Sequence, residues 1–530
     1  MKRKPISYIV ILGVIMLNLN LHAQQWVIEL DNMRSKSINQ SISVDGGEAM
    51  LSVGTSRLTD SNSVNIDVIG YILKVWSDGT SLSREVRIVG NQFFLCTVTE
   101  LDDGNYMAFG YYGDSVVGTS EYYRNIRVLL LDDNLQTLYE KDYRVDTGGF
   151  EGIRMKGYHA LRCAKAEDGN VILVTSPSYY VPNASGGKYM SRFRFYEFTP
   201  AGDTVRTVVQ PEYIVNMEQE GSHTENIIPN PATGGFTFIA IGNYKIPSYS
   251  FYGNYGIWNL SRDMKITSKQ PIVFGSYPLY YCPESMSCEN HWYDDGLFLT
   301  YIHKIRSVDK PVHEGWLFML DTLGGKHLHV QLPPIDSVTL SLPSGCSTAY
   351  VDDSTIFAVT YSEVKYLSNT PWQANITLIN KDLHILGRKV LKDDVWDYNS
   401  PKTPVALQDG NVIIPITRFS NTGEAHYLIY CFKRDDIEIT WDVINENNLN
   451  TCQKVYPNPT KDKLIIPVEN MVSGKLRLII TDIRGDIYVD NSIEADGNLI
   501  VVDVKNLVSG VYVYKVITDM ANVGGRFVKE

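Results

Sequence analysis

Short apolar runs separated by polar turns form the hydrophobic pattern of the chain between residues 40 and 440. No long stretch has the spacing of an amphipathic helix, so the pattern predicts an all-β protein. A turn rich in Asp and Gly precedes an apolar run seven times. These turns are Asp45–Gly47, Asp102–Gly104, Glu167–Gly169, Thr233–Gly235, Asp294–Gly296, Asp352–Ser354 and Gln408–Gly410.

A second apolar run follows in each repeat and ends in another polar turn, as Tyr71–Trp76 does before Asp78 and Gly79. With the shorter runs between them, each repeat has room for four antiparallel strands. Seven repeats of roughly 60 residues predict a seven-bladed β-propeller with long loops. An array of β-sandwiches or two smaller barrels is the alternative. The strand-like stretch Gln25–Leu30 precedes the first repeat, and we expect it to pair with the last repeat and close the ring.

The first 23 residues have the pattern of a secretory signal peptide. Lys2, Arg3 and Lys4 form its positive start, an apolar run follows, and Ala23 is the small residue at the expected cleavage position. An uncleaved membrane anchor is the alternative, although the run is short for a bilayer span. No later segment is apolar enough to cross a membrane, so we expect no transmembrane segment in the mature chain.

Length, charge and cysteine count add three constraints. A chain of 530 residues exceeds what one hydrophobic core usually serves, so a second, smaller domain is expected. The formal charge of −12 argues against nucleic acid as a partner, because such proteins need a basic surface to neutralise phosphates. Seven cysteines leave at least one unpaired, and a disulfide between Cys282 and Cys288 is left open.

The end of the chain carries four short motifs in order. They are Tyr456-Pro457-Asn458-Pro459, a turn from Thr481 through Asp482 to Gly485, the run Leu507–Tyr512 that contains Gly510, and a final strand from Arg526 to Lys529. Together these motifs resemble the type A C-terminal sorting domain of the type IX secretion system. The resemblance implies a small immunoglobulin-like β-sandwich that the outer-membrane translocon recognises, on a protein that is secreted or held at the cell surface. Cleavage of the domain and attachment of the protein to a surface glycan are left open.

These patterns divide the chain into four segments. We expect a signal peptide at residues 1–23, the propeller at residues 24–442, an Asn-rich linker at residues 443–453 and the sorting domain at residues 454–530.

Candidate catalytic residues come from the middle repeats. His159, His223 and His291 precede the turns of the third, fourth and fifth repeats, and Glu225 lies beside His223. In a propeller this region faces the central channel, where imidazoles and carboxylates could act as acid and base or hold a metal ion. Ordinary hydrogen-bonded loop residues are the alternative. The chain has none of the common catalytic or phosphate-binding motifs, so no metal and no cofactor is expected.

Four cysteines occupy similar places before the turns of their repeats, namely Cys96, Cys163, Cys288 and Cys346. We expect them on the innermost strands of different blades, reduced and buried, because a disulfide needs Cα atoms within about 7 Å. Cys452, in the polar linker, is expected to react readily.

The sequence favours a non-catalytic surface or secreted propeller that binds a glycan or a protein through its loops, many of which carry Tyr. The competing hypothesis is a lyase or hydrolase with its site at the channel mouth near His159, His223 and His291. A third possibility is a purely structural component of the cell surface. The expected partners are the secretion translocon and an unidentified glycan or protein.

Overall fold

Three of the turns that recur in the sequence owe their shape to the neighbouring residues Asp, Gly and Asn. In the computed structural model, Gly104, Gly169 and Gly410 have φ values of 79°, 82° and 81°, which only glycine adopts without strain. The preceding Asp in each turn accepts a hydrogen bond from the backbone N–H of the following Asn. The distance from the Asp Oδ1 to the Asn backbone nitrogen is 3.0 Å for Asp103 and Asn105, 3.2 Å for Asp168 and Asn170, and 3.0 Å for Asp409 and Asn411. Each Asp-Gly-Asn turn therefore ends one strand and starts the next.

The structure describes most of the strands and fewer of the loops. The described residues are 26–30, 35–59, 65–113, 125–144, 154–181, 188–210, 214–216, 224–242, 254–271, 273–274, 277–278, 291–292, 298–305, 313–321, 326–332, 343–352, 354–362, 373–391, 396–420, 425–437, 455, 457–467, 475–482, 487–494, 499–517 and 522–530.

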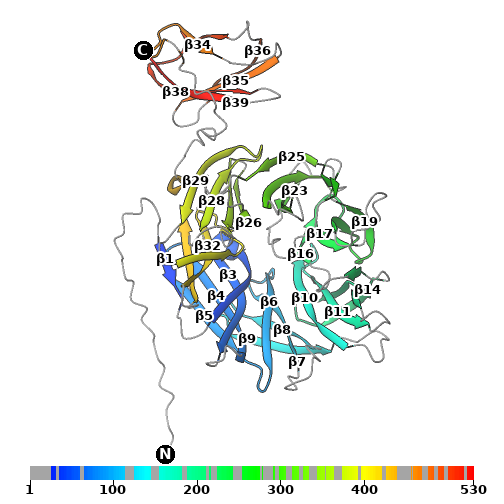
Figure 1. Cartoon of the computed structure of the whole chain (residues 1–530). Helices are drawn as coiled ribbons and strands as arrows, with labels where there is room; N and C mark the ends of the chain where they lie inside the picture. Colours follow the sequence, from blue (N-terminus) through cyan, green and yellow to red (C-terminus); the bar gives the residue numbers. More distant parts are fainter. Residues whose placement is uncertain are drawn as a thin grey trace, which may run out of the picture. The chain divides into compact units, whose positions relative to one another are not determined.

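Four antiparallel sheets follow one another in the first half of the chain (Figure 1). The first contains β2 (Ser35–Val44), β3 (Ala49–Thr59), β4 (Asn65–Trp76) and β5 (Ser81–Val86). The second contains β6 (Gln92–Glu100), β7 (Tyr106–Gly113), β8 (Asn125–Leu131) and β9 (Thr137–Arg144). The third contains β10 (Arg154–Lys165), β11 (Val171–Val181), β12 (Lys188–Ser191), β13 (Arg194–Phe198), β14 (Thr204–Val209) and β15 (Ile214–Asn216). The fourth contains β16 (Thr224–Asn230), β17 (Gly235–Gly242), β18 (Asn254–Leu260) and β19 (Ile266–Pro271).

Three further sheets complete the ring. After a short pair, β20 (Val273–Phe274) and β21 (Tyr277–Pro278), the fifth sheet contains β22 (His291–Trp292), β23 (Phe298–Ile305), β24 (His313–Leu320) and β25 (Lys326–Gln331). The sixth contains β26 (Pro343–Asp352), β27 (Thr355–Ser362), β28 (Ala374–Ile379) and β29 (Ile385–Leu391). The seventh contains β30 (Trp396–Pro401), β31 (Val405–Ala406), β32 (Val412–Ser420), β33 (Ala425–Phe432) and β1 (Trp26–Glu29). The 3-10 turns are η1 (Asp45–Gly47) and η2 (Arg434–Asp436).

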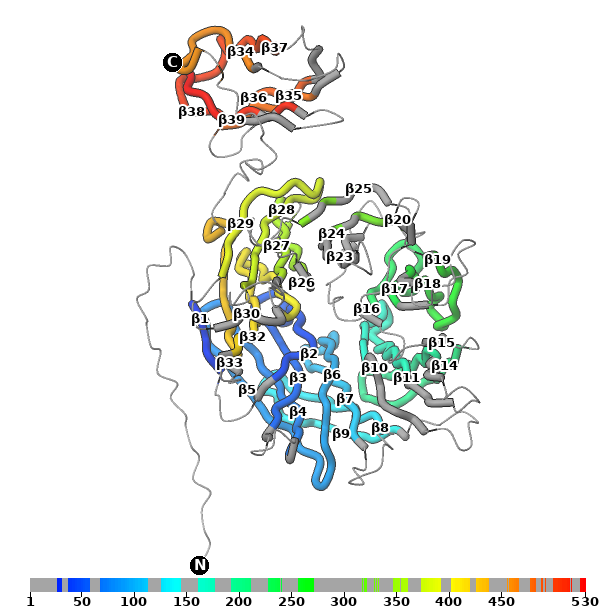
Figure 2. Tube along the Cα trace, viewed as in Figure 1, coloured from blue at the N-terminus to red at the C-terminus, as the bar shows by residue number. Residues whose placement is uncertain are grey.

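The prediction of a seven-bladed β-propeller is confirmed by these sheets. Figure 2 shows the first strand of successive sheets, such as β2, β6, β10, β16 and β26, towards the middle of the ring. Adjacent sheets pack face to face over apolar side chains. The interface between the first two, for example, buries Val53, Leu95 and Leu129 completely.

The ring closes through a strand from the other end of the chain. β1 pairs antiparallel with β33, so that Trp26 lies opposite Cys431 and Glu29 opposite Leu428. The indole of Trp26 also donates to the carbonyl of Ser77 in the first sheet, at 2.8 Å. The expectation that Gln25–Leu30 pairs with the last repeat is therefore confirmed for the described residues, which begin at Trp26. Without β1, the outer edge of β33 would be an unpaired strand edge.

Two buried charges tie neighbouring sheets together. Lys74, near the end of β4, is fully buried inside an apolar run. Its ammonium pairs with Asp45 of its own sheet at 2.7 Å, and with Asp133 of the second sheet. It also donates to the hydroxyl of Tyr106 in the second sheet, at 2.9 Å. Burial, reinforced by Asp45, raises the pKa of Tyr106, so its hydroxyl remains a neutral donor to Asp45.

The equivalent position in the third sheet carries the opposite charge. Glu197 lies two residues before the start of its hairpin turn, as Lys74 does in the first sheet, and is 2% exposed. It accepts from Arg262 of the fourth sheet at 2.6 Å and from Arg206 of its own sheet. Burial acts to raise the pKa of Glu197, but the hydrogen bonds from Asn170 and Arg262 outweigh it and hold that pKa below its usual range.

The C-terminal unit is described by itself, because the chain divides into two compact units between Ile437 and Glu438, with Ile385–Arg388 of β29 grouped with the second. Its two sheets are β34 (Lys463–Pro467) with β37 (Leu499–Asp503), and β36 (Ile487–Glu494), β35 (Lys475–Asp482), β38 (Gly510–Ile517) and β39 (Asn522–Lys529). Leu464 and Ile500 from one sheet share a core with Ile480 and Tyr514 from the other. This unit is the small β-sandwich that the sequence predicted. Within the described ranges of the whole chain, no helix is both long and apolar enough for a membrane span.

Removal of residues 24–30 tests the closing strand. The deletion exposes the edge of β33 and removes Leu30, which is 7% exposed, and the half-buried Trp26 and Ile28. Burial of each large apolar side chain contributes about 1.5–3 kcal/mol, so we expect the free energy of unfolding to fall by at least about 3 kcal/mol. Denaturant unfolding of the shortened and complete proteins measures this. Glu29→Gln is the matched control, and equal unfolding midpoints for the deletion and the complete chain would contradict the expectation.

Candidate functional site

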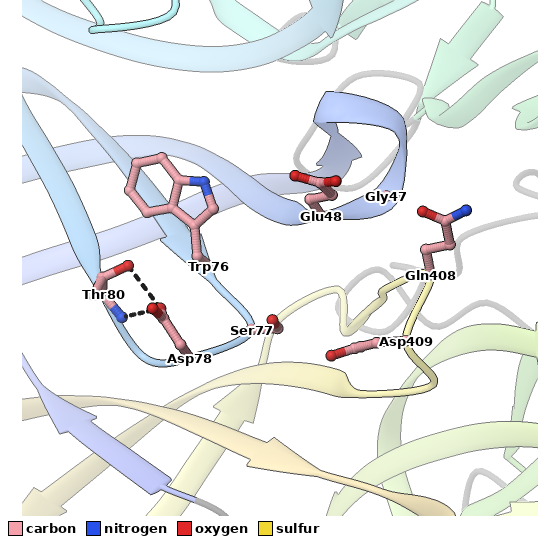
Figure 3. A pocket seen from close by; sticks show the side chains of 8 residues that line it. All are labelled: Gly47, Glu48, Trp76, Ser77, Asp78, Thr80, Gln408 and Asp409. Atoms are coloured by element: carbon pink, nitrogen blue, oxygen red, sulfur yellow. Dashed lines mark hydrogen bonds between the residues drawn. The ribbon is translucent and has the colours of Figure 1, made fainter.

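A pocket lies where the first and seventh sheets meet, at the seam closed by β1 (Figure 3). We call it the seam pocket. Its volume is about 520 Å³. It is lined by Gly47, Glu48, Trp76, Ser77, Asp78, Thr80, Gln408 and Asp409. Gly47 and Glu48 follow β2, the residues from Trp76 to Thr80 end β4 and form the next turn, and Gln408 and Asp409 form the turn between β31 and β32.

Backbone geometry holds the two sides of the seam pocket together. The N–H of Gln408 donates to the carbonyl of Gly47 at 2.8 Å, which links the turns of the seventh and first sheets directly. Gly47 has a φ of 97°, and a Cβ there would lie 3.1 Å from the Cβ of Gln408. Glycine is therefore required at this position for both its conformation and its close approach.

The β4–β5 turn fixes the orientation of one carboxylate. Asp78 accepts from the N–H of Thr80 at 2.8 Å and from its hydroxyl at 2.7 Å. The hydroxyl contact is the main cause that lowers the pKa of Asp78, and the backbone N–H adds to it. Asp78 is therefore charged at neutral and mildly acidic pH.

The wall of the seam pocket combines an aromatic ring with hydrogen-bond acceptors. Trp76 is half-buried, and the buried ammonium of Lys74 lies 4.9 Å from the centre of its ring. Glu48, Asp78 and Asp409 are exposed carboxylates, and none of the eight lining residues carries a positive charge. Such a site can stack a flat apolar surface against Trp76 and accept hydrogen bonds from a ligand.

The catalytic candidates from the sequence occupy the first strands of three successive sheets. His159 lies on β10, Glu225 on β16 and His291 on β22, whereas His223 falls outside the described residues. Their side chains are not among those described, so their convergence stays a prediction. In the described part of the chain, no three His, Cys, Asp or Glu side chains are grouped as metal ligands.

Two cations on sheets that are not neighbours lie near enough for the charge of one to affect the pKa of the other. Lys402 lies between β30 and β31 of the seventh sheet, and Arg162 lies on β10 of the third. Burial lowers the pKa of Lys402, and the positive charge of Arg162 lowers it further.

The sequence alone does not indicate the seam pocket, because its turns have the pattern of ordinary chain reversals. Trp76 directly before a polar turn was the one available signal. The pairing of that turn with Gln408 and Asp409 depends on ring closure and could not be found from local sequence.

The cysteine prediction is confirmed for two of its four residues. Cys96 on β6 and Cys163 on β10 are free and buried, and Cys431 on β33 is also free and buried. Burial raises the pKa of each of these thiols to about 12. The side chain of Cys346, on β26, is not described, and Cys282, Cys288 and Cys452 lie outside the described residues.

The sorting-domain motifs meet at the last strand. The side chain of Asn458 accepts from the N–H of Val528 at 2.8 Å, and the N–H of Thr460 donates to the carbonyl of Val528 at 2.8 Å. Thr460 also forms a parallel bridge with Lys529, which is 8% exposed. The Pro457–Pro459 segment thus fastens β39 to the sandwich.

The other motif residues serve the same core. Tyr512 is buried, lies opposite Asp482 across β38 and β35, and stacks on Phe527 with ring centres 5.6 Å apart. Its hydroxyl donates to the carbonyl of Val508 at 2.8 Å, which shapes the turn before Gly510. Leu507 packs against the core from that turn. Tyr456 and Gly485 fall outside the described residues.

Residues 454–530 match the family described as the secretion system C-terminal sorting domain. The C-terminal unit is therefore a type IX secretion sorting domain, and the protein is secreted or displayed at the cell surface. Comparison with curated proteins gives no match.

Several solved structures resemble the chain at low similarity. A protein of unknown function from Dyadobacter fermentans DSM 18053 has 10% identity and a TM-score of 0.39, over 78% of this chain and 100% of its own. The polysaccharide lyase Uly1 has 9% identity and a TM-score of 0.43, and the match covers 78% of this chain and 99% of the lyase. The NanB sialidase from Streptococcus pneumoniae has 9% identity and a TM-score of 0.40, and the match covers 79% of this chain and 99% of the sialidase. Similarities this low carry no argument about what the present chain binds or converts.

Thiol alkylation tests the buried cysteines. Because a thiol with a pKa of about 12 is almost fully protonated at neutral pH, we expect Cys96, Cys163 and Cys431 to resist alkylation in the native protein. All three should react after denaturation. Mass spectrometry of labelled peptides measures this, and rapid native labelling or a disulfide-linked peptide would contradict it.

Removal of residues 454–530 is expected to block delivery to the cell surface and leave the propeller folded. Asn458→Ala is a milder test, since it frees the N–H of Val528 and loosens β39. Surface proteolysis of cells with type IX secretion should then detect less protein than with the exposed-site control Lys505→Ala. Normal surface exposure of the truncated chain would rule out this role.

Proposed function

We propose that the protein is a non-catalytic binding module, secreted or held at the cell surface, and that its ligand is a glycan bound in the seam pocket. The observation that carries this proposal is the pairing of Trp76 with acceptor side chains in a pocket of about 520 Å³. The volume lies within the range of about 300–1,000 Å³ typical of small-ligand sites. It suits one or a few sugar units.

The chemistry of a sugar matches both parts of the pocket lining, the aromatic ring and the hydrogen-bond acceptors. The C–H face of a pyranose ring is apolar and can stack on the exposed part of the Trp76 indole. Its hydroxyls are donors, and each lining carboxylate keeps free lone pairs beyond its hydrogen bonds within the turn. The backbone link between Gln408 and Gly47 holds both sides in place before binding, which lowers the entropic cost of association.

The competing hypothesis remains a lyase or hydrolase that acts in the central channel. Its support is the position of His159, Glu225 and His291 on the first strands of successive sheets. A polysaccharide panel tests it. Reproducible turnover that disappears in His223→Ala would replace the binding-only function.

Trp76→Ala tests the binding function. We expect it to weaken binding of any glycan that the secreted protein recognises by about tenfold or more, because aromatic anchors carry a large share of binding energy. A glycan array followed by titration calorimetry provides the measurement, with unfolding curves to confirm that the variant is folded.

Tyr139→Ala is the matched control, since Tyr139 is an aromatic residue on β9 of the second sheet and is 38% exposed. Equal binding by the wild-type and Trp76→Ala proteins would remove the seam pocket as the glycan site.

A further inference from the structure

The seam pocket has a one-sided charge. Figure 3 shows Glu48, Asp78 and Asp409 around it, with Trp76 across the pocket from Gln408 and Asp409. Lys74, whose ammonium lies 4.9 Å from the centre of the Trp76 ring, is fully buried and already pairs with Asp45 and Asp133. Its charge is therefore neutralised within the protein and does not balance the three carboxylates of the lining.

A ligand that enters this pocket meets acceptors that carry full negative charge. Hydrogen bonds from a protonated amine to a carboxylate are charge-assisted and roughly twice as strong as those between neutral groups. A ligand carboxylate or sulfate would meet like charge and lose its hydration without a partner. The affinity of the pocket should therefore be highest for amine-bearing ligands, lower for neutral ligands and lowest for acidic ones.

The carboxylates come from both sides of the seam. Glu48 and Asp78 belong to the first sheet, and Asp409 belongs to the seventh. A chain of sugar units can present amines to both sheets while one ring stacks on Trp76. The aromatic wall therefore favours a sugar over a flexible basic peptide, which has no comparable flat apolar face.

We propose that the seam pocket selects glycans that bear free amino groups, such as oligosaccharides of glucosamine, and that it discriminates against uronate- or sulfate-bearing glycans. This inference rests on the proposed function and names the ligand class of the same pocket. Bound across the seam, such a glycan also links the first and seventh sheets and stabilises the closed ring.

Two tetrasaccharides with the same backbone test the proposal. One is built of glucosamine and the other of N-acetylglucosamine, so the ammonium groups of the first are replaced by neutral acetamides in the second. With the complete secreted protein, calorimetry should show about tenfold tighter binding of the glucosamine tetramer. Because the carboxylates are exposed, this preference should shrink between about 0.01 M and about 0.15 M NaCl, as the screening length falls from about 30 Å to about 8 Å.

Variants distinguish the contribution of the lining carboxylates to binding from that of the Trp76 side chain. The double substitution Glu48→Gln with Asp409→Asn should remove the preference and leave weak binding of both tetramers, whereas Trp76→Ala should weaken both. Glu167→Gln removes an exposed carboxylate from the corresponding turn of the third sheet, and it should leave the binding of both tetramers unchanged.

Each outcome has a definite meaning. Equal binding of the two tetramers would overturn the amine preference and leave the seam pocket as a glycan site. Tighter binding of a tetragalacturonate would also overturn it. Tighter binding of tetralysine than of the glucosamine tetramer would replace the glycan with a basic peptide. Failure of all these probes to bind in a manner that depends on Trp76 would remove both this inference and the proposed function.

Discussion

Closure of the seam between the first and seventh sheets is the constraint on which the rest of the propeller depends. β1 contributes the outer strand of a sheet whose other strands come from the far end of the sequence, so the ring forms only when both ends have been brought together. The same event brings Gln408 against Gly47 and the Trp26 indole against the first sheet. The seam pocket is therefore a product of closure, and a ligand that fills it favours the closed state.

Between the other sheets, burial of apolar faces supplies most of the stabilisation, and buried ion pairs link neighbouring sheets. Lys74 and Glu197 occupy the same place in their hairpins and reach the turn of the following sheet with opposite charge, towards Asp133 and Arg262 respectively. A buried charge is tolerated only with partners on all sides, and breaking one of these networks by removing a partner is costly. Each network thus joins the end of a strand in one sheet to a turn of the next.

Local chemistry could be predicted from the sequence wherever a few adjacent residues determine the outcome. The turns rich in Asp and Gly belong to this class. The number of sheets followed from the spacing of those turns, the pairing of the stretch before residue 31 from the need to close the ring, and the sandwich from the resemblance of the terminal motifs to a sorting domain. Lys74 could not be predicted as buried, because its partners are distant in sequence. Asp45 lies at the start of the same repeat, and Tyr106 and Asp133 come from the next one. The seam pocket could not be predicted for the same reason, since Asp409 meets Glu48 and Trp76 only through the closed ring. The secretory role followed from motifs, whereas the ligand depends on side chains from opposite ends of the chain.

Hydrogen–deuterium exchange of the complete protein, with and without a glucosamine oligosaccharide, examines the seam pocket without any substitution. Binding there should slow exchange in the β4–β5 turn around Asp78 and in the β31–β32 turn around Asp409 together, and also in β1, whose pairing closes the ring. Protection confined to the first strands near His159 and His291, with the seam unchanged, would show that the ligand binds in the central channel instead.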